Sequence, residues 1–373
     1  MKTAVAVTAD FVIDYEINVF ENGWIIYDGK TVKFQYQEPQ GRIKKIYKKN
    51  TVLFPALVNA HTHLELSLMD FNPEKTTSFD NWLLWIISNR QKLDIEEIKK
   101  GVKIGKNLTR KWGTGFIGDI SSFGVSEVEN GMVFHEIIGN RFPGKISLPI
   151  SIHAIYSTSV EVIKQGARLS KERNLPFQMH IGESYNELLF ARGEKNVFES
   201  RIYPTLGRKR FEHLTADSVI DYIEKCEALC PQLIAVHCTN LTRKELEKLM
   251  NTGAGIVICP RSNLFLKTGF PNVEFIGQYE KAGIGTDGLS SNTSLSLLSE
   301  IKTLYFRTEG KISLKNLLYM ATTGGARTLG IEETYRKSGI FTAVKPALKI
   351  SDPFKTLLMD DISIELFDLS SPK

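Results

Sequence analysis

A chain of 373 residues, with 42% hydrophobic and 24% charged residues, is too long for one small domain and suits a large barrel with a small accessory domain. No apolar run approaches the roughly 20 residues of a membrane span, and a formal net charge of +5 is modest for a protein that binds nucleic acid. Asp10, Asp14 and Glu16 interrupt the apolar pattern of the N-terminus, unlike the core of a secretory signal, so we expect a cytoplasmic protein.

The chain begins with short strand patterns over residues 4 to 54. Phe11–Asn18, Gly23–Tyr27 and Thr31–Tyr36 are separated by turn signals such as Asp28-Gly29. A basic run with five lysines and arginines, from Arg42 to Lys49, follows them. We expect it to form a solvated loop or hairpin, because a nucleic-acid patch needs interleaved aromatics and a wider basic surface.

A different rhythm begins at Pro55, where short apolar runs rich in β-branched residues alternate with helical patterns. We identify eight such runs: Leu57–Glu65, Gly115–Ser121, Met132–Gly139, Ile146–Ala154, Pro176–Glu183, Leu233–Asn240, Gly255–Asn263 and Ala282–Gly288. The helical patterns between them include Glu96–Lys111, Ser159–Arg173, Ala216–Ala228 and Arg243–Asn251. Eight alternations predict an α/β fold with a parallel sheet closed as a (β/α)₈ TIM-type barrel.

The strand patterns at both ends of the chain predict a second unit. We expect residues 55–330 to form the catalytic barrel. Residues 1–54 and 331–373 are expected to pair into a small β-sandwich-like domain beside it.

The histidines gather where a barrel enzyme keeps its active site. The chain has seven, and five lie at or near the C-terminal ends of predicted strands: His61, His63, His153, His180 and His237. Asp287 follows the eighth strand. His135 lies within a strand and His213 in a polar region, so we expect both to be structural.

Four of these residues predict a metal site. His61 and His63 project to the same face of one strand, and His180 and Asp287 add a nitrogen and an oxygen. Three imidazoles and a carboxylate suit Zn²⁺ or Fe²⁺ rather than Ca²⁺ or Mg²⁺. The alternatives are hydrogen-bonded core histidines and an aspartate that only forms a turn. No lysine near His153 could bridge a second ion, so we expect one divalent transition metal per chain.

Three further side chains are candidates for proton transfer and substrate binding. Glu183 follows His180 by three residues, where a carboxylate could carry protons for a water whose pKa a metal lowers from about 15.7 to roughly 7. A helix cap or a surface position is the alternative. His237 is interpreted as a group that holds the water, with a fifth ligand as the alternative. His153 is expected to contact substrate unless it is a satisfied core histidine.

Five separated motifs resemble the amidohydrolase superfamily, in the order and spacing of its aminohydrolase (deaminase) branch. They are Phe54-Pro-Ala-Leu-Val-Asn-Ala-His-Thr-His63, Met179-His-Ile-Gly-Glu183, Val236-His237, Cys259-Pro-Arg-Ser-Asn263 and Gly285-Thr-Asp287. The resemblance implies four metal ligands and two residues that handle protons, namely His61, His63, His180 and Asp287, with Glu183 and His237.

Longer runs narrow the resemblance within that branch. Asn59–Ser67, Ser78–Leu83 and Thr286–Leu298 are similar to the 6-aminodeoxyfutalosine deaminases of menaquinone synthesis. This implies a small-molecule nucleoside substrate, whose adenine-type amino group is hydrolysed to an inosine-type carbonyl with release of ammonia. Adenosine or S-adenosylhomocysteine deamination, a chlorohydrolase-type reaction and a non-catalytic scaffold are the alternatives, and a homodimer is left open.

The chain departs from the family pattern at two places. His-Ala-Pro-Tyr-Ser becomes His153-Ala-Ile-Tyr-Ser157, and the tail from Gly339 lacks the usual closing Ala-Asp-Leu motif. We therefore expect the loop formed by residues 153–157 to lie differently from the corresponding loop of the family.

The far end of 6-aminodeoxyfutalosine carries a benzoate, and burying a carboxylate without a partner is costly. The candidates to pair with this carboxylate are Arg90, after the aromatic and apolar stretch Trp82–Ile87, and Arg141 and Arg261, just beyond the third and seventh predicted strands. Trp82 and Trp85 could supply flat walls for the aromatic ring. The alternative for each arginine is a solvated surface position.

Overall fold

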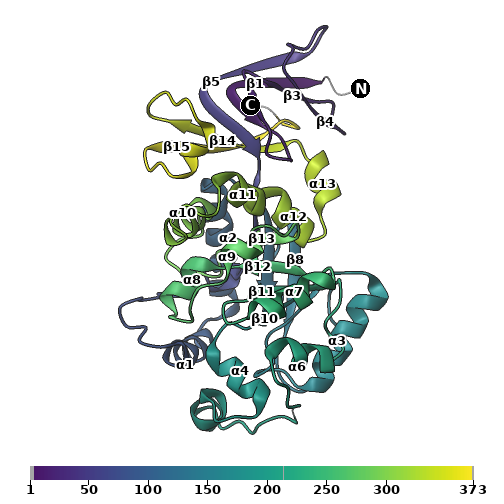
Figure 1. Ribbon diagram of the computed structural model, residues 1–373, viewed down its shortest axis with the longest axis vertical. Helices are drawn as coiled ribbons and strands as arrows, with labels where there is room; N and C mark the ends of the chain where they lie inside the picture. The colour runs from purple at the N-terminus through teal and green to yellow at the C-terminus, as the bar shows by residue number, and fades with distance from the viewer. Residues whose placement is uncertain (1–3, 213, 372–373) are drawn as a thin grey trace.

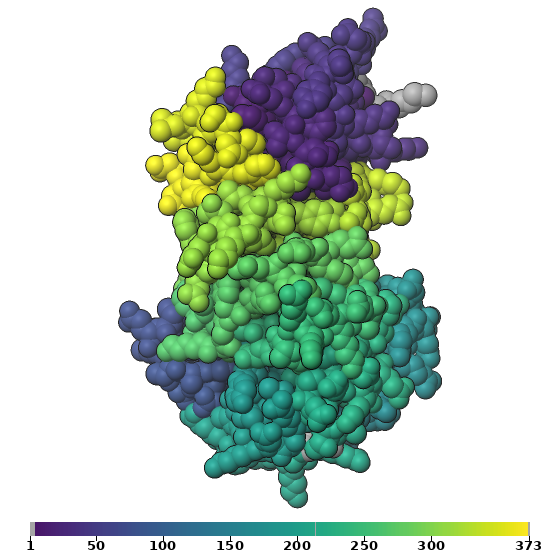
Figure 2. Space-filling model, viewed as in Figure 1, coloured from purple at the N-terminus to yellow at the C-terminus, as the bar shows by residue number. Residues whose placement is uncertain are grey.

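The computed structural model describes residues 4–212 and 214–371, so the interpretation of His213 lies outside it. Two sheets dominate the fold. The terminal segments form a sheet at one end, the barrel occupies the rest, and α11 (Leu314–Tyr319) and α12 (Gly325–Thr328) lie between them (Figure 1). The space-filling view shows the same division, with the first and last segments of the chain side by side (Figure 2).

The terminal sheet has seven strands in the described chain, in the order β15-β14-β5-β1-β3-β4, with β2 paired to β1. They are β1 (Val5–Ile13), β2 (Val19–Glu21), β3 (Trp24–Tyr27), β4 (Val32–Gln35), β5 (Lys44–Pro55), β14 (Ile340–Pro346) and β15 (Ile362–Asp368). The C-terminal hairpin joins the N-terminal strands through β14 and β5, with Phe341 opposite Pro55. The prediction of a small β domain built from both ends of the chain is confirmed.

The expectation of a loop at the basic run was wrong for most of its length. Lys44 to Lys49 belong to β5, which pairs in parallel with β1. Lys45 and Lys48 form ion pairs of 2.7 Å with Glu38 and Glu365. The run is therefore a strand with a charged, solvated face, and the distant partner strand that stabilises it leaves no mark on the local pattern.

The second sheet is the barrel, with eight parallel strands in the order in which they follow along the described chain. They are β6 (Leu57–Thr62), β7 (Thr114–Ser121), β8 (Gly131–Ile137), β9 (Ile150–Ile152), β10 (Phe177–Ile181), β11 (Leu233–His237), β12 (Gly255–Ile258) and β13 (Ala282–Ile284). Each predicted run overlaps one of them, with β7 and β8 beginning one residue earlier than predicted, which confirms the TIM-type barrel. Several, such as β10 and β11, are buried along their whole length, as strands covered on both faces are.

Helices cover the barrel between the strands. The main ones are α1 (Phe79–Arg90), α2 (Ile95–Lys111), α3 (Val160–Arg173), α4 (Tyr185–Arg192), α6 (Val219–Lys225), α7 (Arg243–Asn251) and α10 (Leu297–Arg307). The shorter ones are α5 (Tyr203–Thr205), α8 (Pro260–Phe265), α9 (Val273–Ile276) and α13 (Glu332–Lys337), with the turns η1 (Leu64–Leu66), η2 (Phe198–Ile202), η3 (Met320–Gly324) and η4 (Pro353–Leu357). No described helix is long and apolar enough to cross a membrane.

Side-chain caps explain where several helices begin. Asp94 forms a reciprocal capping box with Glu97 at the start of α2, and Ser159 accepts a hydrogen bond from the Val162 amide at the start of α3. The predicted helix over residues 216–228 is shorter in the structure, because Ser218 caps it and its hydroxyl accepts from the Asp221 amide at 3.1 Å.

The two ends of the barrel face different surroundings. The Leu57 amide, at the start of β6, donates to Thr342 Oγ1 of β14 at 3.3 Å, and that hydroxyl donates to Gly113 O, just before β7, at 2.7 Å. The terminal sheet therefore lies against the N-terminal ends of these strands. The C-terminal ends, where barrel enzymes carry their active sites, point away from it.

Candidate active site

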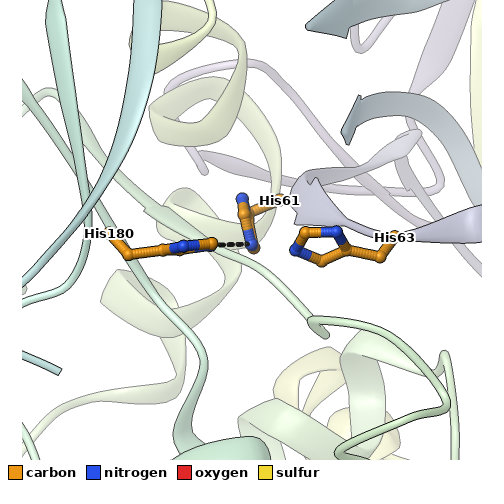
Figure 3. Close-up of side chains that lie close together, drawn as sticks. All are labelled: His61, His63 and His180. Carbon is orange, nitrogen blue, oxygen red and sulfur yellow. Dashed lines mark hydrogen bonds between the residues drawn. The ribbon is translucent and has the colours of Figure 1, made fainter. Parts of the chain in front are cut away.

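Three histidines meet at the C-terminal ends of the strands. His61 and His63 come from β6 and the residue after it, and His180 comes from β10; one ligand atom from each lies within 4.8 Å of the others. The Nε2 atoms of His61 and His180 are 3.3 Å apart. Figure 3 shows the three rings gathered together, and the ring centres of His63 and His180 are 5.8 Å apart. Burial holds the pKa of His61 and of His180 below the usual value, so both imidazoles are neutral and offer lone pairs.

Asp287 completes the cluster from the turn after β13. Its Oδ1 lies 3.5 Å from His63 Nε2 and 3.8 Å from His61 Nε2. Its Oδ2 accepts hydrogen bonds of 2.7 Å from the hydroxyls of Ser262 and Ser291. One oxygen is thus anchored while the other faces the imidazoles. Burial alone would raise the pKa of this carboxyl, but its electrostatic interaction with His63, first among the facing histidines, and the Ser291 hydrogen bond hold it below its usual range.

One residue that orients His61 was not predicted from the sequence. Gln178 Oε1 lies 2.6 Å from His61 Nδ1, and its amide nitrogen donates to Ala60 O at 3.0 Å. An amide oxygen beside Nδ1 requires the proton there, which leaves Nε2 free to bind an ion. A signal was available, because Gln178 precedes His180 by two residues and so shares its strand face.

The donor set fits a divalent transition metal. Three imidazole nitrogens and one carboxylate oxygen converge, and each of the four residues is at most 9% exposed. Gln178 orients His61, and Ser262 orients Asp287. Buried His180 Nδ1 has no hydrogen-bond partner among the described residues. Such a set is typical of Zn²⁺ or Fe²⁺ sites.

Glu183 and His237 lie together at the wall of the same site. His237 Nε2 is 3.5 Å from Glu183 Oε1, and the Asn263 amide nitrogen lies 3.1 Å from His237 Nδ1. Glu183 is 4% exposed, and Ser184 rather than Glu183 is the N-cap of α4. Burial raises the pKa of the Glu183 carboxyl, and the charges of Asp287 and Glu187 raise it further. The Glu183 amide donates to Glu187 Oε2 at 3.0 Å, which fixes the backbone at this point.

These groups open into a cavity of about 420 Å³ that His63, His180, Glu183, His237 and Asp287 line at its inner end. His153 also lines it, with its ring centre 4.9 Å from that of His180 and its Nδ1 2.7 Å from Ser157 Oγ. One wall is α1, with Trp82, Leu83, Ile86 and Ile87, and another is the segment with Ile202, Tyr203, Leu206 and Phe211. Arg201 joins the two walls, because it forms an ion pair with Asp80 and donates to Asn81 Oδ1 at 2.6 Å.

The structure separates the three arginine candidates. Arg90 lines the cavity, but it is 3.5 Å from the Glu136 carboxylate and its guanidinium lies over the Phe123 ring. Arg261 donates to Asn292 Oδ1 at 3.2 Å and to Thr293 Oγ1 at 2.8 Å. Neither Arg261 nor Arg141 is among the described residues that line the cavity. The structure therefore does not place Arg261 or Arg141 where either could pair with a group bound in the cavity.

Two other cations line the cavity instead. Arg208 and Lys209 lie on the segment between α5 and α6, and neither has an ion pair among the described residues. The only sequence signal was a short basic run, which by itself indicates a solvated surface. Of the two tryptophans, Trp82 lines the cavity and donates through Nε1 to Ser290 O at 2.7 Å, whereas Trp85 lines a separate hollow behind α1.

The chain is similar in sequence to one known protein family and to several deaminases. The family model described as "Amidohydrolase family" matches residues 146–335. The 5-methylthioadenosine/S-adenosylhomocysteine deaminase of Halothermothrix orenii is 25% identical, covering 87% of this chain and 79% of the relative. The adenosine deaminase of Helicobacter pylori is 26% identical, covering 88% of this chain and 86% of the relative.

Solved structures share the fold across the whole chain. The aminofutalosine deaminase of Helicobacter pylori has a TM-score of 0.81 at 23% identity, with all of both chains covered. An adenosine deaminase from Xanthomonas campestris with bound zinc has a TM-score of 0.80 at 19% identity, covering all of this chain and 93% of the other. At these identities the structural likeness shows the fold.

Proposed function

The chain belongs to the amidohydrolase family, and from this premise we propose that it catalyses the hydrolytic deamination of an adenine-type nucleoside. The observation that carries the proposal is the convergence of His61, His63 and His180 with Asp287 Oδ1, beside the Glu183–His237 pair. The names of the relatives, deaminases of adenine nucleosides, support the same reaction. In this proposal residues 55–330 are the catalytic unit.

His61, His63, His180 and Asp287 would hold one divalent metal, which when bound lowers the pKa of a water molecule to roughly 7. The reaction joins the oxygen of that water to C6 of the purine and breaks the bond from C6 to the amino nitrogen. Glu183, within reach of His237 at the cavity wall, takes a proton from the water and passes it to the ring nitrogen. The second proton of the water, carried by the new hydroxyl at C6, passes to the amino group, which leaves as ammonia while the carbonyl forms.

His237 and His153 have separate parts in this scheme. The side chain of Asn263 holds the His237 ring, so its Nε2 stays directed at Glu183 and keeps the water in place. Ser157 likewise holds His153 by Nδ1, which leaves the opposite edge of the ring to contact the purine. Fixed side chains of this kind lower the entropic cost of reaching the reactive arrangement.

Within the adenine nucleosides, the substrate that we propose is 6-aminodeoxyfutalosine, with futalosine and ammonia as products. The apolar walls of the cavity suit an extended substituent on the ribose, and Arg208 and Lys209 suit a carboxylate at its far end. Adenosine and 5-methylthioadenosine carry no charge there. The name of one structural neighbour, an aminofutalosine deaminase, points to the same substrate.

Steady-state assays with four substrates test the proposal. We expect ammonia release from 6-aminodeoxyfutalosine with a kcat/KM at least tenfold above those of adenosine, 5-methylthioadenosine and S-adenosylhomocysteine. A preference for adenosine would contradict the specific substrate and leave the deaminase reaction intact. Release of chloride from chlorinated triazines, without deamination of any purine nucleoside, would contradict the reaction itself.

A further inference from the structure

A buried carboxylate lines the cavity and has no part in the chemistry above. Glu136 stands near the C-terminal end of β8, and its side chain is 2% exposed. It pairs in register with Ser151 of β9, two residues before His153. Glu136 therefore lies one strand away from His153, on the side farther from β10 and His180.

Only one oxygen of Glu136 is occupied. Its Oε2 accepts a hydrogen bond of 2.5 Å from Ser122 Oγ and lies 3.5 Å from Arg90 Nη1. The Ser122 amide donates to Glu65 Oε2 at 2.7 Å, which holds this neighbour in place. Among the contacts of the described residues, Glu136 Oε1 accepts no hydrogen bond. The carboxylate is thus fixed through one oxygen while the other remains for a ligand.

The surroundings keep this group charged. Burial would raise the pKa of Glu136, but the charges of His153 and Arg90 and the Ser122 hydrogen bond outweigh it and hold the pKa below its usual value. Around it the cavity is mostly apolar, with Ile86, Ile87 and other side chains at its wall. A charged acceptor in such surroundings forms strong hydrogen bonds with hydroxyl donors and is costly to leave without them.

The position of Glu136 indicates which part of a nucleoside it meets. The imidazole cluster fixes where the reacting carbon of the purine must lie, and His153 adjoins His180. A purine that reaches from the cluster past His153 places its attached sugar toward the neighbouring strand end, where Glu136 stands. We propose that Glu136 accepts hydrogen bonds from the vicinal 2′ and 3′ hydroxyls of the substrate's ribose. This subsite rests on the proposed function, and it makes those hydroxyls a specificity requirement.

The test compares adenosine with 2′,3′-dideoxyadenosine in the purified, metal-loaded enzyme. We expect the wild type to prefer adenosine by roughly 10- to 100-fold in kcat/KM, the scale of hydrogen bonds to a buried charge. Glu136→Gln keeps the shape of the side chain and removes the charge. It should lower kcat/KM for adenosine by a similar factor and change that for the dideoxynucleoside less than about threefold.

Asp119→Asn is the matched control, because Asp119 is also a buried strand-end carboxylate. It hydrogen-bonds the Leu64 amide at 2.9 Å and the Ser126 hydroxyl, and it does not line the cavity. We expect it to change both substrates alike. Equal losses for both substrates in Glu136→Gln would show that Glu136 only neutralises Arg90, and would overturn the inference.

The substrates alone provide a second test if Glu136→Gln does not fold. A wild type that treats adenosine and the dideoxynucleoside alike, within about threefold, overturns the inference without any variant. Failure of the proposed function has a different signature, because the wild type would then release ammonia from no adenine nucleoside.

Discussion

Replacement of Glu183 by glutamine removes the proposed proton carrier and leaves its shape. Glu183 is 4% exposed, and the hydrogen bond from its amide to Glu187 does not depend on the Glu183 carboxylate. We therefore expect an intact fold and unchanged metal content. The loss in kcat should lie between about 10² and 10⁴, the scale of general acid–base catalysis, or about 3 to 5 kcal/mol at 1.36 kcal/mol per tenfold.

We expect the loss in kcat to lie in the upper half of that range, because the site is enclosed. Water that could relay protons in place of Glu183 has little access to a side chain buried to this extent. Glu187→Gln is the matched control, since Glu187 is buried beside Glu183, has a raised pKa of about 8 and does not line the cavity. We expect it to lower kcat by less than about tenfold.

The assay follows the ultraviolet absorbance of the purine at saturating substrate. Metal content and thermal unfolding are measured on the same preparations. A Glu183→Gln variant that holds its metal and turns over within about tenfold of the wild type would refute the assignment, and so would equal losses in the Glu183 and Glu187 variants.

Three further predictions concern the metal and the substrate's far end. Elemental analysis should find about one transition metal per wild-type chain and none in the His61→Ala, His63→Ala double variant, whereas two metals per chain at full occupancy would contradict a mononuclear site. Gln178→Leu should weaken metal binding by roughly 10- to 100-fold in a chelator competition, because the residue that orients His61 is lost; unchanged affinity would show that His61 is held by other contacts. Arg208→Met with Lys209→Met should raise KM for 6-aminodeoxyfutalosine about tenfold and leave turnover of adenosine nearly unchanged, and an equal effect on both substrates would place the carboxylate elsewhere.

The barrel and its metal cluster were predictable for the same physical reason. Buried parallel strands give near-continuous apolar runs such as Leu233–Val236, and residues two apart on a strand share a face. His61 and His63 could therefore be assigned to one side of β6. Because the carboxyl ends of parallel strands meet at one end of a barrel, His180 and Asp287 could be expected beside them.

The features that were not predicted from the sequence owe their positions to contacts between distant segments. The basic run before Asn50 is a strand because β1 pairs with it, and no local pattern carries that information. Glu136 gains its place in the cavity from Ser122 and Arg90, which come from two other elements. Arg208 and Lys209 reach the cavity through a segment without regular structure, whose course the hydrophobic periodicity does not specify.

The most direct test of the account is ammonia release from 6-aminodeoxyfutalosine and adenosine by the purified protein, before and after removal of its metal. We predict one ammonia and one inosine-type product for each substrate consumed, loss of the activity with a chelator, and its return when about one equivalent of Zn²⁺ or Fe²⁺ is added. Absence of ammonia from both nucleosides, in protein whose three-histidine site is shown to hold a metal, would contradict the proposed function.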